Sequence, residues 1–135
     1  MKTITVDSSV LVAILGGEPG WRRLEQVLSD SAPIVSSVSV LETYLVTRKS
    51  LGEFTSIALN KVLIEYAFTV SEFGLSHLSY AQIAFEKYGK GRHPARLNFG
   101  DCIVYATAKL SDTPLLFVGD DFAKTDLEVV RIPEA

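Results

Sequence analysis

Short apolar runs alternate along this chain with longer stretches whose apolar residues recur at helical spacing. The short runs favour strands at Thr3–Val6, Pro33–Ser36, Phe68–Val70, Pro114–Val118 and Glu128–Arg131. The longer stretches favour helices at Ser8–Leu15, Pro19–Ser29, Ser37–Leu51, Glu53–Ala67, Leu75–Tyr88 and from the capping residue Asn98 to about Leu110. Strands that alternate with helices indicate an α/β fold whose sheet is mostly parallel and covered on both faces.

Apolar positions within the predicted helices identify candidate core residues. They are Val38, Leu41, Leu45, Val46, Ile57, Val62, Leu63, Leu78, Ile83 and Phe85. In a parallel sheet of this kind, ligands bind beyond the carboxyl ends of the strands. The residues that follow the predicted strands are therefore the first place to look for chemistry.

The composition supports one domain over residues 1–135. Hydrophobic residues make up 47% of the chain and charged residues 21%, a balance that supports a sizeable core and argues against disorder. The single cysteine, Cys102, excludes an internal disulfide and fits a reducing cytoplasm. The sequence shows neither a signal-peptide pattern nor an apolar run of about 18 residues, so we expect a cytoplasmic protein without a membrane span.

Four acidic residues recur at one kind of position. Asp7 directly follows the first predicted strand, and Asp120 lies two residues past the strand that ends at Val118. Glu42 lies early in the helix after the second strand, and Asp101 lies in the first turn of the helix that Asn98 opens. Strand ends and helix starts converge at one edge of a parallel sheet, so these carboxylates are candidates for a common site.

Carboxylates gathered in this way suit a hard divalent cation. Mg²⁺ and Mn²⁺ prefer oxygen ligands, and a bound ion polarises a phosphodiester and activates a water molecule for attack. Each residue also has a simpler interpretation: Asp7 as a helix cap, Glu42 as a solvated helix residue, Asp101 as a partner of the helix dipole, and Asp120 as a turn residue. Their common placement, rather than any one of them, indicates a metal site.

Net charge neither supports nor excludes a nucleic-acid substrate. The chain carries a net charge of −3, and leaving out the four candidate site acids gives +1. A bound cation would offset part of the charge of the site itself.

Several segments resemble PIN-domain ribonucleases of the VapC toxin type, in the right order over nearly the whole chain. They are Ile4–Ser9, Ser39–Glu42, Leu97–Cys102 and Leu115–Leu127, of which the region from Leu97 to Leu127 is the most specific. The resemblance implies a three-layer α/β/α domain with a sheet of four to five strands, and RNA cleavage that depends on Mg²⁺ or Mn²⁺. It also implies a VapB-type antitoxin whose C-terminal tail blocks the site, and a homodimer or a hetero-oligomer with that antitoxin.

Site roles follow from the same resemblance. Asp7 and Asp101 match the main metal ligands, Glu42 a further acid for metal or water, and Asp120 the fourth acid. Asp121 competes with Asp120 for the last role. In addition, Ser8 is a candidate hydrogen-bond donor to a site carboxylate or a metal-bound water, and Asp126 is a candidate for a contribution nearby.

A basic segment precedes the helix that carries Asp101. Lys87, Lys90, Arg92 and Arg96, with His93 among them, place four positive charges and no acid within ten residues. The segment is either a phosphate-binding or antitoxin-binding lip beside the acids, or a solvated loop.

Two kinds of alternative compete with the ribonuclease: another aspartate-phosphorylated protein on a similar sheet, and a protein that is not an enzyme. An aspartyl-phosphate phosphatase resembles a strand followed by Asp-x-Asp, but Ser9 stands where the second aspartate is needed. A phospho-acceptor receiver domain wants a lysine after the last full strand, where Gly119 and Asp120 stand. A protein that only binds partners is the other alternative, and the presence of all four acids argues against it.

Overall fold

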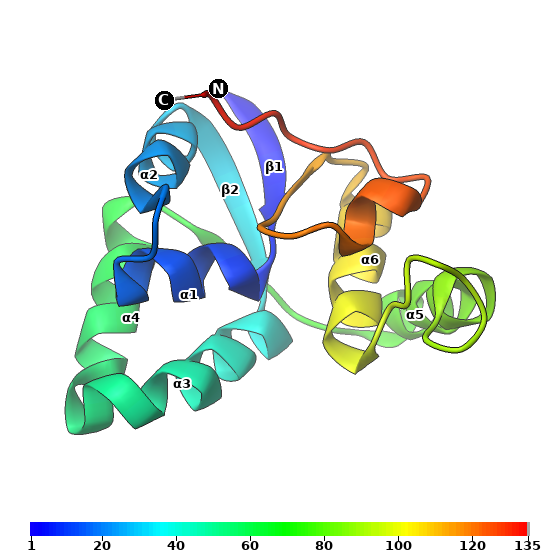
Figure 1. Ribbon diagram of the computed structural model, residues 1–135, viewed down its shortest axis with the longest axis horizontal. Coiled ribbons are helices and arrows are strands. Elements are labelled where there is room, and N and C mark those ends of the chain that lie inside the picture. Colours follow the sequence, from blue (N-terminus) through cyan, green and yellow to red (C-terminus); the bar gives the residue numbers. More distant parts are fainter. Residues whose placement is uncertain (135) are drawn as a thin grey trace.

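Four parallel strands form the central sheet of the computed structural model, which describes residues 1–134 (Figure 1). The strands are β1 (Lys2–Val6), β2 (Ser31–Ser36), β3 (Thr69–Ser71) and β4 (Leu115–Leu116), in the spatial order β3-β2-β1-β4. The register of β1 on β2 runs from the pair Lys2 and Ser31 to the pair Thr5 and Ile34. All carboxyl ends therefore meet at the same edge of the sheet.

Helices cover both faces of this sheet. The structure contains α1 (Ser8–Gly16), α2 (Trp21–Ser29), α3 (Ser37–Leu51), α4 (Thr55–Glu65), α5 (Leu75–Tyr88) and α6 (Phe99–Ser111), with short 3-10 helices η1 (Gly52–Phe54) and η2 (Asp121–Lys124). In Figure 1, α1, α2 and α4 lie on one side of the sheet and α6 on the other, with α5 outside α6. The three-layer α/β/α arrangement predicted from the sequence is confirmed. None of the helices within residues 1–134 is long and apolar enough to cross a membrane.

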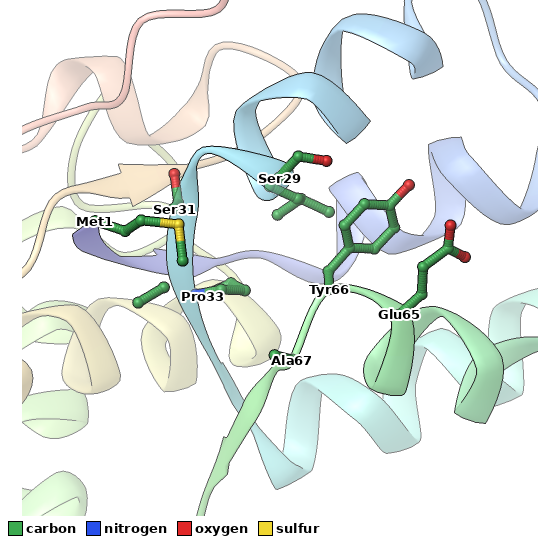
Figure 2. A pocket seen from close by; sticks show the side chains of 9 residues that line it. Met1, Ser29, Ser31, Pro33, Glu65, Tyr66 and Ala67 are labelled. Atoms are coloured by element: carbon green, nitrogen blue, oxygen red, sulfur yellow. The ribbon is translucent and has the colours of Figure 1, made fainter.

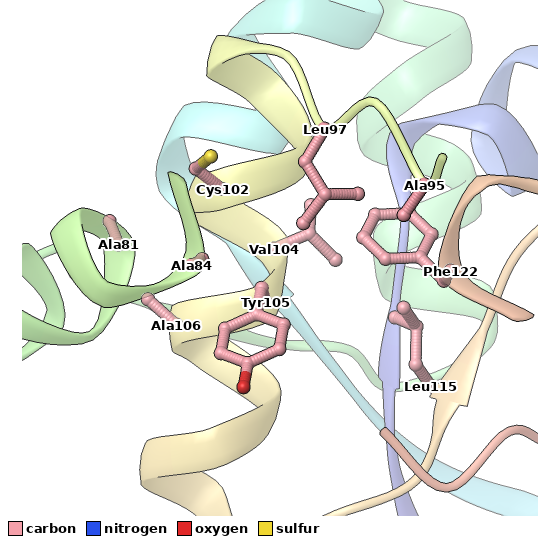
Figure 3. Close-up of a cluster of buried hydrophobic side chains, with 10 residues drawn as sticks. All are labelled: Ala81, Ala84, Ala95, Leu97, Cys102, Val104, Tyr105, Ala106, Leu115 and Phe122. Carbon is pink, nitrogen blue, oxygen red and sulfur yellow. The ribbon is translucent and has the colours of Figure 1, made fainter. Parts of the chain in front are cut away.

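The core lies on both faces of the sheet because side chains alternate along each strand. Leu115 packs with Tyr105 and Ala84 between β4, α6 and α5 (Figure 3). The next residue, Leu116, packs on the opposite face with Ile4 from β1 and with residues of α1 and α2. Two residues of β4 thus join the two halves of the core.

Two predicted helices have the bounds expected from the sequence. The helix Ser37–Leu51 begins after Ser36, whose Oγ accepts a hydrogen bond from the backbone N–H of Val38 at 3.2 Å, and it ends at Gly52. Leu75–Tyr88 likewise matches its prediction. For Ser37–Leu51, the local capping residues Ser36 and Gly52 mark the two ends.

Other predicted bounds were wrong. The helix expected from Pro19 begins at Trp21, because Gly20 has a φ of 89° and interrupts the helical backbone. The helix expected over Glu53–Ala67 divides into η1 and α4, and it ends before Ala67, which has a φ of 52°. The fifth predicted strand, Glu128–Arg131, is reduced to one parallel bridge between Val129 and Leu115.

The largest error concerns which helix faces are buried. Seven predicted core residues are exposed: Leu41, Leu45, Val46, Ile57, Leu78, Ile83 and Phe85. In α3 the buried stripe consists instead of Ser39, Thr43 and Thr47. The hydroxyl of Thr43 donates to the carbonyl of Ser39 at 2.8 Å, and that of Thr47 to the carbonyl of Thr43 at 2.7 Å. Because the helix's own carbonyls satisfy these hydroxyls, they are buried without a polar penalty.

The same preference for small residues appears in α5. Its buried residues are Ala81 and Ala84, which face α6. Small side chains let the two helices approach closely, while the larger Leu78 and Phe85 line an apolar hollow of about 560 Å³ together with Phe99 and Ile103 of α6.

Candidate active site

Asp7 begins the site at the carboxyl end of β1. Its side chain is only 7% exposed, and it caps α1 by accepting a hydrogen bond from the backbone N–H of Ser9 at 3.1 Å. Burial raises the pKa of Asp7, and the negative charge of Glu42 adds to that effect. The interpretation as a helix cap is therefore correct, and the capping residue also lies close to a second acid.

Glu42 reaches the same place from α3, which packs against α1. It is half-buried, and the hydroxyl of Ser8 donates a hydrogen bond to its Oε1 at 2.6 Å. Ser8 thus binds a site carboxylate, as one of the two alternatives from the sequence proposed. Glu42 also lies against the backbone of Gly100 in the first turn of α6, a contact that gave no signal in the sequence.

Asp101 is the third residue of α6 and forms a reciprocal capping box with Asn98. The backbone N–H of Asn98 donates to Oδ2 of Asp101 at 3.1 Å, and the backbone N–H of Asp101 donates to Oδ1 of Asn98 at 3.0 Å. Burial raises the pKa of Asp101 to about 6, and the negative charges of Asp7, Asp121 and Glu42 act in the same direction. The bond from Asn98 opposes this rise only in part.

Hydrogen bonds between neighbouring segments hold this edge together. The backbone N–H of Asp7 donates to the carbonyl of Leu116 at 3.0 Å, which joins the end of β1 to β4. The backbone N–H of Val118 donates to Oγ of Ser9 at 3.0 Å, which fastens the segment after β4 to the start of α1. The loop with Asp120 and Asp121 is thereby tied close to Asp7.

Of the two adjacent loop aspartates, Asp121 is the one whose charge acts on Asp101. Both side chains are exposed, Asp120 before η2 and Asp121 in its first turn. The choice of Asp120 as the fourth acid stays a prediction. The competing residue, Asp121, is the one whose negative charge helps to raise the pKa of Asp101.

Asp126 has a different role from the one expected. Its Oδ1 accepts a hydrogen bond from the hydroxyl of Tyr105 at 2.7 Å, and its Oδ2 pairs with Nζ of Lys109 at 2.8 Å. Burial opposes ionisation of Asp126, but these bonds outweigh it and lower the pKa of the carboxyl. The residue fastens the C-terminal segment to the later turns of α6, beyond Asp101.

The basic segment is partly used within the fold. Arg92 pairs with Glu86 at 3.2 Å and lies over the ring of Phe85. Nδ1 of His93 accepts a hydrogen bond from the backbone N–H of Ala95 at 3.0 Å, and its ring packs edge-on against Tyr88. Two of the residues expected to meet phosphate therefore also have partners inside the domain.

Cys102 follows Asp101 and is buried, as expected of a small core residue. Burial raises the pKa of its thiol to about 11, and the charge of Asp101 contributes. A thiol with that pKa stays protonated near neutral pH, which argues against a nucleophilic role.

Within residues 1–134, none of the site acids forms an ion pair with a basic side chain. In the part of the chain that the structure describes, the ion pairs are Lys2–Glu128, Arg92–Glu86 and Lys109–Asp126, and none involves Asp7, Glu42 or Asp101. Buried and half-buried carboxylates that repel one another without a counter-charge favour a cation.

The donor set fits a hard divalent ion in composition. Its members are carboxylate oxygens, the ligands that Mg²⁺ and Mn²⁺ prefer. Residues 1–134 hold no ready-made group of three or more His, Cys, Asp or Glu side chains at metal-binding distances. Mg²⁺ needs only one or two carboxylates when water completes its coordination, so the fit rests on the chemistry of the carboxylates and not on a preformed cage.

The hollow beside the acids is smaller than two hollows found elsewhere in the described residues. A hollow of about 230 Å³ borders Glu42 and Gly100 between α3 and α6, and its other walls are apolar. Figure 2 shows a different hollow, of about 480 Å³, at the amino ends of β1 and β2, where Tyr66 and Met1 contribute to the lining. The chemistry is therefore not expected in the roomier cavity.

Comparison with known proteins agrees with this architecture. The family model for the PIN domain matches residues 4–128. Ribonuclease VapC36 of Mycobacterium tuberculosis is 42% identical over 125 residues, which cover 91% of this chain and 90% of the relative.

Solved structures share the fold. The sarcin–ricin loop cleaving toxin VapC20 of Mycobacterium tuberculosis has a TM-score of 0.77 at 15% identity, with 95% of this chain and 98% of the other covered. VapBC2 of Rickettsia felis, solved with a promoter DNA fragment, has a TM-score of 0.74 at 15% identity, with 95% and 97% covered. From the family match and the identity to a VapC ribonuclease over most of both chains, this protein belongs to the PIN-domain family of VapC ribonucleases.

Proposed function

We propose that this protein is the toxin of a VapBC-type pair, a cytoplasmic endoribonuclease that cleaves RNA phosphodiester bonds with Mg²⁺ or Mn²⁺ at Asp7, Glu42 and Asp101. The observation that carries the proposal is the convergence of these carboxylates at the end of the sheet, where no basic side chain of residues 1–134 forms an ion pair with them. A fourth acid from the loop after β4, Asp120 or Asp121, completes the proposed site.

In this proposal Asp7 and Asp101 would hold the ion, and Glu42 would accept a proton from the attacking water. When bound, the ion polarises the phosphodiester and lowers the pKa of a coordinated water. In the described part of the chain Ser8 donates to Oε1 of Glu42, so Oε2 would be available to accept a proton from the water. Asn98 keeps Asp101 in one orientation through the capping box, and α1 does the same for Asp7.

A VapB-type antitoxin is the proposed regulator. The structural neighbour from Rickettsia felis is described as a VapBC2 complex. By analogy, the free toxin is active and the bound toxin is blocked. We also propose that the toxin forms a homodimer, or a hetero-oligomer with the antitoxin.

The test is cleavage of structured RNA by the purified, antitoxin-free protein. We expect cleavage with Mg²⁺ or Mn²⁺, loss of cleavage with excess chelator, and recovery when the ion is restored. Cleavage that continues at the same rate in chelator would contradict metal dependence, and absence of cleavage under all of these conditions would contradict the nuclease assignment.

A further inference from the structure

Gly100 occupies a position where a glycine needs an explanation. It is the second residue of α6, directly before Asp101, and its backbone is helical. Glycine is less favourable than alanine within a helix, because it loses more conformational freedom on folding. Gly100 does not have a left-handed conformation that would require glycine, so the explanation lies in the atoms that a side chain at this position would contact.

That space is taken by the carboxylate of Glu42. A Cβ at position 100 would lie 2.6 Å from Oε2 of Glu42, 3.1 Å from Oε1 and 3.2 Å from Cδ. The first distance is far inside van der Waals contact, so a methyl group and the carboxylate cannot occupy their places together.

The same carboxylate is also held by Ser8. Its hydroxyl donates to Oε1 of Glu42 at 2.6 Å across the contact of α1 with α3. Glu42 is therefore confined between a hydroxyl on α1 and the bare backbone of α6.

We propose that Gly100 is a positioning residue, whose missing side chain lets Glu42 lie against the first turn of α6 beside Asp101. The proposal rests on the role of Glu42 in the proposed site. Gly100 itself touches neither ion nor RNA in this account; it acts by determining where the carboxylate of Glu42 lies.

The atoms that surround position 100 determine the effect of adding a methyl group there. Its neighbours are the end of a flexible side chain rather than backbone, so the carboxylate moves and the helix stays. Gly100→Ala is therefore expected to fold normally, with a melting temperature equal to or above that of the wild type, and to lose the bond from Ser8 to Glu42.

The decisive comparison pairs Gly100→Ala with Gly16→Ala. Gly16 is also helical, at the end of α1, and a Cβ there would meet Cγ of Glu18 at an ordinary 3.6 Å. We expect Gly100→Ala to cut the rate of RNA cleavage by about 10- to 100-fold, as misplacement of a reacting group by about 1 Å does. Gly16→Ala should stay near the wild-type rate.

A readout independent of cleavage is a crystal structure of the metal-free Gly100→Ala protein. A Glu42 carboxylate displaced from its wild-type position, with the contact to Ser8 lost, supports the proposal. A carboxylate in the same place, or wild-type cleavage by a well-folded Gly100→Ala protein, overturns it.

Combining Gly100→Ala with Glu42→Gln separates this proposal from the site assignment. If Gly100 acts through Glu42, the double variant cleaves no more slowly than Glu42→Gln alone. Losses that multiply would show an independent role for Gly100 and contradict the proposal. Wild-type cleavage by Glu42→Gln would remove Glu42 from the site, and the positioning role with it.

Discussion

Asp101 shows at the scale of one residue why this edge of the sheet favours a cation. Its carboxyl is partly buried and close to the charges of Asp7, Glu42 and Asp121, and these raise its pKa to about 6. A carboxyl whose pKa is raised in the folded state opposes folding once it is ionised. The arrangement is unfavourable for the metal-free protein and favourable for one that binds a divalent ion.

A pH-dependent stability follows for the metal-free protein. The pKa of Asp101 is about 6 in the folded state against an ordinary value of 3.8, so the folded state binds the proton more tightly. The resulting stability is present below about pH 4 and is lost as the pH rises through 6. We expect Asp101→Asn to be more stable than the wild type at pH 7 by about 1 kcal/mol, after a discount for solvent screening.

Thermal unfolding in chelator measures this difference. The advantage of Asp101→Asn should shrink toward zero below pH 4, where the wild-type carboxyl is protonated. An equal difference at pH 7 and at pH 4 would contradict the electrostatic explanation.

The fourth acid is decided by a matched pair of substitutions. Because the charge of Asp121 reaches Asp101, we expect Asp121→Asn to reduce cleavage and metal affinity more than Asp120→Asn does. The larger loss in Asp120→Asn would instead assign the role to Asp120. The measurements are cleavage rates at a fixed Mn²⁺ concentration and Mn²⁺ binding by calorimetry.

Individual site residues differ in how far the sequence predicted their surroundings. Asp7 and Asp101 were identified because a strand end and a helix cap are local features. The sequence left two possible partners for Ser8, a site carboxylate or a metal-bound water. The choice depends on the packing of α1 on α3, which brings Glu42 within reach of Ser8 and is not a local feature of the sequence. Gly100 was missed entirely, because the atom that explains it belongs to a residue far away in the sequence.

At the scale of elements, α3 shows how apolar periodicity can mislead. Its apolar stripe, which includes Leu41 and Leu45, is exposed, and its threonines face the interior. A pattern of apolar residues predicts a helix well but predicts the buried face only if the core is apolar. Hydroxyl groups that hydrogen-bond to carbonyls of their own helix can be buried too, so the buried face need not be the apolar one.

This reversal predicts unequal effects of two leucine substitutions on stability. Leu45 is 60% exposed in α3, whereas Leu11 in α1 is fully buried. Leu45→Gln should change the free energy of unfolding by less than about 0.5 kcal/mol, and Leu11→Ala should lower it by about 2–5 kcal/mol. Denaturant titration of both proteins measures the difference, and a loss for Leu45→Gln as large as for Leu11→Ala would contradict the buried threonine face.

At the scale of the whole molecule, parallel strands account for the site. The alternation of strands and helices in the sequence predicted that β1, β2 and β4 would end at one edge, and this is the edge where Asp7, Glu42 and Asp101 meet. The lengths of the strands could not be predicted in the same way. Within residues 1–134 the last apolar segment forms a single bridge, Val129 with Leu115, through the backbone hydrogen bonds of Glu128 and Val130. Such pairing depends on the neighbouring strand rather than on local pattern.

Cleavage by Asp101→Asn tests the central claim most directly. The amide keeps the shape of the side chain and can still accept the bond from Asn98, but it is a poorer metal ligand. Asp112→Asn is a matched control, since Asp112 lies exposed at the other end of α6 in a left-handed conformation that asparagine tolerates.

With Mg²⁺ or Mn²⁺ present, we expect Asp101→Asn to cleave RNA at least about 100-fold more slowly than the wild type while it remains folded. Asp112→Asn should cleave at the wild-type rate. Equal cleavage by wild type and Asp101→Asn would contradict the assignment of this edge of the sheet as the active site.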